Sequence, residues 1–205
     1  NYTVTLTVSN SYGSSTLQKT NYIQVVNPPE FLSGWSYRKL HTISGSTTAL
    51  TDYQVRFKVY NTTGTDSGEN VYLGSTVKPD FCDIRFTTID NTVLHYWIQE
   101  TGSNYAIVWV KIPSIPTTGT QLYLYYGNPS ATSLSNGEAT FSQFDDFSGT
   151  TINTTKWSVI SGNGNIYQSE GILHLDYSGS QNNDWWTSGR SGTALRLNSL
   201  PPGTF

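Results

Sequence analysis

The sequence predicts an all-β protein made of antiparallel β-sandwich or jelly-roll modules in tandem. Several segments, such as "YTVTLTVS" and "DYQVRFKVY", alternate apolar and polar residues with the period of a half-buried strand. Turns rich in glycine, proline, serine and threonine separate these segments, and none of them shows a helical period. Short strands at this spacing, with no helices between them, are typical of sandwiches and barrels.

The first block, residues 1–27, is expected to form two strands. Val4, Leu6 and Val8 share one face of the first strand, and threonines occupy the other face. The stretch "YTVTLTVSNSYGSSTLQKTNYIQV" resembles the closing strands of an immunoglobulin-like domain of the polycystic-kidney-disease (PKD) type. Because a lone hairpin is marginal in water, these strands should pair with a neighbouring domain or another subunit. Residues 28–34 are predicted to be a linker.

The middle block, residues 35–141, contains five further predicted strands: "DYQVRFKVY", "FCDIRFTTI", "VLHYWIQE", "YAIVWVKIP" and "TQLYLYYGN". In the second of these, the alternation puts Asp83 and Arg85 on the polar face. Trp97 and Trp109 lie in apolar runs and are expected in the core. In order, these segments resemble an uncharacterised all-β domain family of archaeal and bacterial surface proteins, also found beside TolQ/ExbB-type proteins. That resemblance implies no known activity.

The stretch "LYLYYGNPSA" in this block could be a stacking platform for a ligand or a packed strand. Leu122, Leu124 and Tyr126 fall on one face, which we predict to be core. Tyr123 and Tyr125 fall on the other face, which we predict to contact a neighbouring module or subunit. The preceding strand is also apolar on both faces, so we expect the two strands to lie in one sheet that is covered on both sides.

The last block, residues 142–205, resembles the start of a concanavalin-like or laminin-G-like jelly roll through "FDDFSGTTINTTKW" and "GILHLDYSG". Some members of that group bind sugars and calcium. Asp145 and Asp146 offer oxygen ligands, so calcium is the one cofactor that we consider. Exposed tryptophans stack on sugar rings, and the candidate carbohydrate ligands are Trp35, Trp185 and Trp186, with Asn183, Asp184 and Arg190 as polar partners.

Composition restricts the partners and the compartment. The 205 residues include 11 basic and 14 acidic ones, and no basic run, so nucleic acid and anionic membranes are poor partners. No membrane span is visible. The chain is rich in serine, threonine, tyrosine and asparagine, which indicates an extracellular or cell-surface protein. Asn61 and Asn153 begin triplets that permit glycosylation, as does Asn1.

The chain is not expected to be an enzyme. Its strand carboxylates are isolated, no Gly-x-Ser-x-Gly turn occurs, and Cys82 is predicted on an apolar face where its thiol is inert. We therefore expect a structural or adhesive cell-surface protein that assembles with other subunits or neighbouring domains, by strand donation among other routes. The alternative is a set of carbohydrate-binding modules belonging to a larger secreted enzyme.

Overall fold

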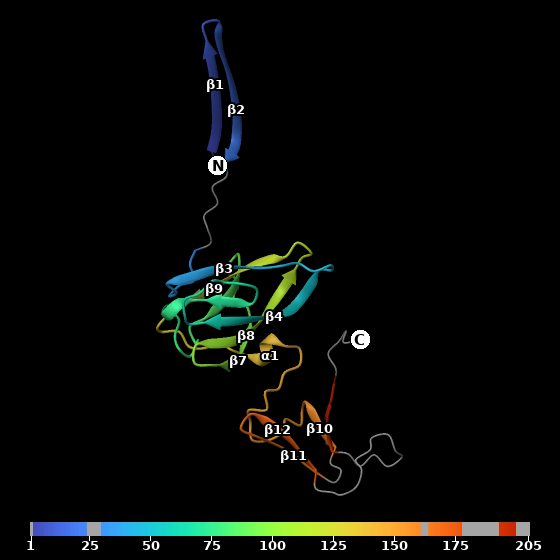
Figure 1. Ribbon diagram of the computed structural model, residues 1–205. Coiled ribbons are helices and arrows are strands. Elements are labelled where there is room, and N and C mark those ends of the chain that lie inside the picture. Colours follow the sequence, from blue (N-terminus) through green and yellow to red (C-terminus); the bar gives the residue numbers. More distant parts are fainter. Residues whose placement is uncertain (1, 24–29, 161–163, 178–192, 200–205) are drawn as a thin grey trace.

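The computed structural model describes residues 2–23, 30–160, 164–177 and 193–199. Within these ranges the chain forms strands β1 to β13, one short α-helix and one 3-10 turn (Figure 1). The sheets are antiparallel apart from one short parallel pair. The expected all-β class is therefore confirmed.

Strands β1 (Tyr2–Asn10) and β2 (Gly13–Ile23) form a two-stranded hairpin. Its turn is closed by the Asn10 side chain, whose Oδ1 accepts a hydrogen bond from the Tyr12 backbone N–H at 2.9 Å. Gly13 follows at φ 148°, a conformation that L-residues rarely adopt. The strand predicted at β1 is present, with Leu6 opposite Leu17 in the register. The expectation that it is half-buried is wrong, because every residue of β1 is exposed.

Two sheets enclose the main core. The first has the order β3-β9-β6, with β3 (Tyr37–Ile43), β9 (Thr120–Tyr126) and β6 (Arg85–Thr88). The second has the order β5-β4-β8-β7, with β5 (Asn70–Tyr72), β4 (Leu50–Tyr60), β8 (Tyr105–Ile115) and β7 (Tyr96–Thr101). Between them lie fully buried side chains from both sheets, including Phe57, Val59, Phe86, Val108, Leu122 and Leu124.

The prediction that β8 and β9 share one sheet is wrong. The turn between them leads from the second sheet to the first, so the two strands lie in different sheets. Each strand is apolar on both faces because a different segment covers its outer face. On β9, Leu122 and Leu124 are buried and Tyr126 packs partly buried against the same core, as predicted. Tyr125 is also buried, on the outer face of the first sheet.

Strand β6 begins at Arg85, four residues later than the alternation indicated. Phe81 adopts a φ of 55°, and its backbone N–H donates to the Lys78 carbonyl at 2.9 Å, so the chain turns before the strand starts. The prediction that Asp83 and Arg85 lie on a polar face is wrong, because they are only 1% and 3% exposed. Residues 61–79, which follow β4, contain β5 and the 3-10 turn Gly74–Thr76.

The outer face of β7 and β8 is covered by helix α1 (Gly137–Thr140) and the residues after it. Trp97 lies 5.9 Å from Phe141 and 4.7 Å from Phe144, between ring centroids, and Trp109 lies 5.9 Å from Phe141. Both tryptophans are half-buried under this cover. They are therefore not part of the core between the sheets, where the sequence had placed them.

The last block forms two small pairs of strands among the described residues. Strand β10 (Trp157–Ile160) pairs with β13 (Ala194–Leu197), and β11 (Gly164–Ser169) pairs with β12 (Ile172–Tyr177), both antiparallel. The short alternating strand expected in "GILHLDYSG" is confirmed as β12.

Candidate functional site

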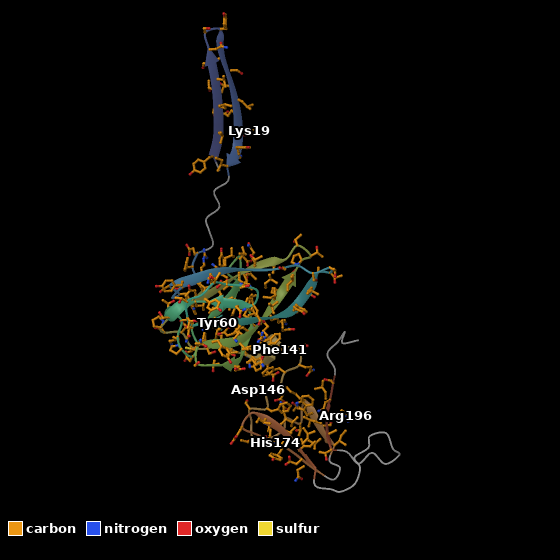
Figure 2. All side chains as sticks on the ribbon, in the orientation of Figure 1. Lys19, Tyr60, Phe141, Asp146, His174 and Arg196 are labelled. Carbon is orange, nitrogen blue, oxygen red and sulfur yellow. The ribbon has the colours of Figure 1, made fainter. Side chains whose placement is uncertain are left out.

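The β1–β2 hairpin presents most of its apolar side chains on one exposed face. Cross-strand pairs lie on the same face of a sheet, and the pairs Leu6–Leu17 and Tyr2–Ile23 are apolar on both strands. Val4 and Val8 lie on the same face, opposite Lys19 and Ser15. We call the apolar residues of this face the hairpin apolar face (Tyr2, Val4, Leu6, Val8, Leu17 and Ile23). Its members are between 38% and 62% exposed. Figure 2 shows the side chains projecting from both sides of the hairpin, with Lys19 labelled on β2.

The opposite face of the hairpin is polar and bonded to itself. The Thr7 and Thr16 hydroxyls lie 3.0 Å apart across the strands, and the Gln18 side-chain amide donates to the Thr5 hydroxyl at 3.4 Å. Both outer edges of the hairpin also carry backbone groups that no described strand pairs with. The hairpin therefore offers the two features that a β-sheet partner uses, an apolar face and a free edge.

Glu30 and Phe31, at the described end of the segment between the hairpin and the sandwich, lie against the first sheet. The Arg38 guanidinium lies between two rings, with its Cζ 4.5 Å from the Phe31 centroid and 4.2 Å from the Tyr123 centroid. The Tyr125 hydroxyl donates to Asn91 Oδ1 at 2.7 Å, and the Asn91 amide donates to the Glu30 carbonyl. This part of the predicted linker thus covers Tyr125, so Tyr125 is not a free platform.

A second set of predicted residues forms a buried polar cluster. Trp35, a candidate sugar ligand, donates from Nε1 to the Asp83 carbonyl at 2.7 Å, and its ring lies 5.1 Å from the Arg85 guanidinium carbon. Arg85 donates to the carbonyls of Cys82, Ile84 and Thr132 and to the Tyr96 hydroxyl. The half-buried indole of Trp35 is therefore engaged in packing.

Cys82 lies beside this cluster in a turn, and its Sγ contacts the Ala131 carbonyl at 3.4 Å. Burial raises the pKa of the Cys82 thiol, and the nearby Asp80 carboxylate raises it further. A raised pKa keeps the thiol protonated, which agrees with the expectation of an inert cysteine although the residue is not in a strand.

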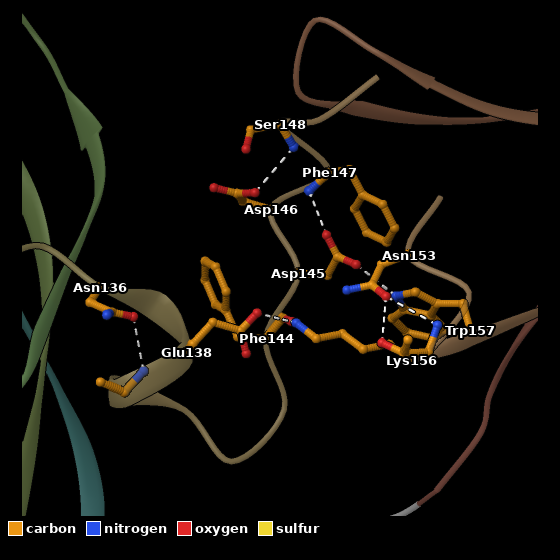
Figure 3. A network of polar contacts seen from close by, with 12 residues as sticks. Asn136, Glu138, Phe144, Asp145, Asp146, Phe147, Ser148, Asn153, Lys156 and Trp157 are labelled. Atoms are coloured by element: carbon orange, nitrogen blue, oxygen red, sulfur yellow. Dashed lines mark hydrogen bonds and ion pairs between the residues drawn. The ribbon is translucent and has the colours of Figure 1, made fainter. Parts of the chain in front are cut away.

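The two candidate calcium ligands point in different directions in Figure 3. Asp145 accepts hydrogen bonds from the Phe147 N–H at 2.9 Å and from Trp157 Nε1 at 2.8 Å, whereas Asp146 accepts from the Ser148 N–H at 3.1 Å. Among the described residues no group of three or more His, Cys, Asp or Glu side chains could hold a metal ion. Calcium at Asp145 and Asp146 stays a prediction.

The same junction ties the last block to the sandwich. The Lys156 ammonium pairs with Glu138 of α1 and donates to the Phe144 carbonyl at 2.6 Å (Figure 3). Phe144 in turn packs on Trp97, and Gly137 leaves the space that its ring occupies. This contact could not be predicted from the sequence, because it depends on a four-residue helix too short to show a period.

The remaining candidates are placed as follows. Six of them lie outside the described residues: Asn1, Asn183, Asp184, Trp185, Trp186 and Arg190. Asn61 is half-buried at the end of β4, and Asn153 is exposed, with its Oδ1 accepting from the Thr155 N–H at 3.1 Å. No helix in the described ranges is long and apolar enough to cross a membrane.

Comparison with known proteins gives one match. Residues 80–160 match the DUF2341 family, described as a domain of unknown function. The matched segment is less than half of the chain and runs from the turn before β6 to the end of β10. This match supports the resemblance of the middle block to an uncharacterised domain. No curated protein and no solved structure matches the chain, and the resemblances of the first and last blocks stay predictions.

Proposed function

We propose that this chain is part of an extracellular structural or adhesive protein, and that the β1–β2 hairpin is its assembly element. The carrying observation is the hairpin apolar face, on which Leu6 and Leu17 are each 61% exposed. Burying one leucine side chain stabilises a contact by about 1.5–3 kcal/mol. A sheet of another subunit or of a neighbouring domain is the partner that fits, since it would cover the face or extend a free edge.

The rest of the described chain supports a scaffold role in this proposal. The sandwich has a hydrophobic core, and the junction at Phe144 and Lys156 joins it to the following strands. Such modules hold a distal surface at a fixed distance and need no catalytic group. The alternative role, a set of carbohydrate-binding modules, has no support from Trp35, whose ring and N–H are both engaged.

The test is a pair of matched double variants of the 205-residue chain. Leu6→Lys with Leu17→Lys places two charges on the apolar face, and Thr5→Lys with Gln18→Lys places the same charges on the polar face. We expect the first variant to lose concentration-dependent association in light scattering and the control to keep it. Equal association of both variants would contradict the proposal, as would a wild-type chain that stays monomeric at millimolar concentration.

A further inference from the structure

The first sheet of the sandwich ends on a strand whose outer edge has no partner strand. Strand β9 pairs with β3 on one side and with β6 on the other, so β3 is an edge strand. No strand in the described ranges lies on the side of β3 that faces away from β9. The edge is 7 residues long, and Leu40 at its middle is 48% exposed. An edge of this length can accept a strand from another chain.

The edges of β5, β6 and β7, in contrast, are engaged by their own chain. The outer edge of β6 bonds to residues 92–94. On β7, the Ile98 N–H donates to the Ser135 hydroxyl at 2.8 Å, and on β5, the Tyr72 N–H donates to the Asp66 carboxylate at 2.9 Å. Such contacts occupy backbone groups that an incoming strand would need, so these edges are poorer acceptors than β3.

A hollow of about 230 Å³ lies beside the β3 edge and is lined by both sheets. Its lining includes His41 and Ile43 of β3 and Val55 of β4, and the Arg56–Glu69 ion pair borders it. Strand β5 pairs only with the last three residues of β4, so Val55 lies on a stretch of β4 that β5 does not reach. The hollow therefore marks a position where a further strand would fit against both sheets.

Strand β1 of the hairpin has the pattern that this position requires. It is 9 residues long, against 7 for β3, and it contains no charged side chain, whereas β2 carries Lys19. Beside β3, β1 can point its half of the hairpin apolar face toward the hollow and its threonines outward, next to the exposed Thr42. An apolar cavity of about 150 Å³ holds a benzene ring, so the hollow has room for an aliphatic side chain such as that of Leu6.

Given the assembly role proposed for the hairpin, on which this acceptor rests, we propose that β1 of one copy adds to the β3 edge of a second copy. Each copy carries both the donor and the acceptor. The hairpin does not occupy the edge of its own chain, since every residue of β1 and β2 is exposed. The addition extends the first sheet to the order β2-β1-β3-β9-β6 and uses the hairpin apolar face and a free edge together. Such head-to-tail pairing builds a ring or an open filament.

The test is cysteine trapping between two preparations of the 205-residue chain that both carry Cys82→Ser. The donor carries Thr3→Cys, Thr5→Cys or Thr7→Cys, and the isotope-labelled acceptor carries Thr42→Cys, so the mixed dimer is identified by its mass. Residues opposite each other on neighbouring strands have Cα atoms about 4.5–5.5 Å apart, which is within the range of a disulfide.

The control acceptor carries Thr101→Cys, at an exposed residue of the edge strand β7. With at least one donor, Thr42→Cys should give about tenfold more mixed dimer than the control, because pairing raises the effective concentration of the two thiols. Leu6→Lys with Leu17→Lys in the donor should remove this excess. The thermal melt of each variant identifies a loss that comes from unfolding.

Equal trapping by Thr42→Cys and Thr101→Cys with all three donors would overturn the β3 acceptor. If the wild type still associates through Leu6 and Leu17 in that case, the assembly role stands and only the acceptor is wrong. A chain with both Thr5→Cys and Thr42→Cys that closes an intrachain disulfide, when the mixture gives no mixed dimer, would also overturn it, because the hairpin would then pair with its own sandwich. A wild-type chain that stays monomeric would contradict both proposals.

Discussion

Leu6 and Leu17 lie directly opposite each other across the β1–β2 hairpin, and each is 61% exposed. Every residue of these two strands is exposed. A hairpin of this kind gains little from its own cross-strand pairs, since a two-stranded sheet is marginally stable at best in water. The exposed Leu6–Leu17 pair therefore indicates that the hairpin needs a partner to be stable.

The hairpin and the sandwich should be energetically independent. Replacing Leu6 and Leu17 by lysine should change the free energy of unfolding of the sandwich by less than about 0.5 kcal/mol, because neither side chain contacts it. Chemical denaturation followed by tryptophan fluorescence measures this, since the described tryptophans lie at or beyond Trp35. A loss above about 1 kcal/mol would show that the hairpin apolar face packs on the sandwich.

Asp83 should be a strong determinant of stability. Asp83→Ala leaves the Lys78 and Gly127 backbone N–H groups without their acceptor, which should cost about 3 kcal/mol in the free energy of unfolding. The control Asp80→Ala removes an exposed carboxylate that accepts one backbone N–H, from Cys82, and should cost under about 1 kcal/mol. Equal losses in the two variants would contradict the assignment of Asp83 as a buried double acceptor.

Gly137 should be intolerant of a side chain. A Cβ at this position would lie 2.1 Å from Phe144 Cζ, so Gly137→Ala should push Phe144 off Trp97 and destabilise the fold by about 1–3 kcal/mol. Combining it with Phe144→Leu should cost less than the sum of the two single changes, because the smaller side chain makes room. Additive losses, or unchanged tryptophan fluorescence in Gly137→Ala, would argue against this contact.

His41 should make stability depend on pH. Burial lowers the pKa of His41 below its ordinary value of 6.5, with Asp66 raising it and Lys39 lowering it further; the ring packs on Phe57 at 4.9 Å. The folded state therefore binds fewer protons than the unfolded chain. The contribution is fully present above about pH 6.5 and is lost as the pH falls toward the lowered, folded-state pKa.

The check is the slope of the free energy of unfolding between pH 7 and pH 5. His41→Gln should flatten this slope, because it removes the group whose pKa burial lowers. The difference in slope between the wild type and His41→Gln reports His41 together with its interaction with Asp66. An unchanged slope in His41→Gln would contradict the buried, neutral imidazole.

The fold class and most strands could be predicted from alternation, but the assignment of strands to sheets could not. Consecutive strands β8 and β9 are both apolar on both faces, for different reasons. The outer face of β8 is covered by Phe141, and the outer face of β9 by Phe31 and Arg38. The residues that cover each outer face come from a segment distant in the sequence. A local pattern of period two within a strand carries no information about such a segment.

The candidate sites were harder to predict. Asp83 and Arg85 alternate with apolar residues like any exposed pair, and only their backbone partners show that they are buried. The packing of Tyr37 had no signal of its own, because it depends on Gly127, ninety positions later in the chain. The hairpin apolar face is the one surface that was visible from the start, since Val4, Leu6 and Val8 needed only the period of the strand.

The most direct test of hairpin assembly is amide hydrogen exchange of β1 and β2 in monomeric and in assembled protein. In the monomer the cross-strand amides should exchange within about tenfold of an unfolded peptide, because local opening costs little. In the assembled protein they should be protected, and Leu6→Lys with Leu17→Lys should abolish that protection. Hairpin amides as slow as those of β8 in a monomer, or unprotected amides in the assembly, would contradict the proposal.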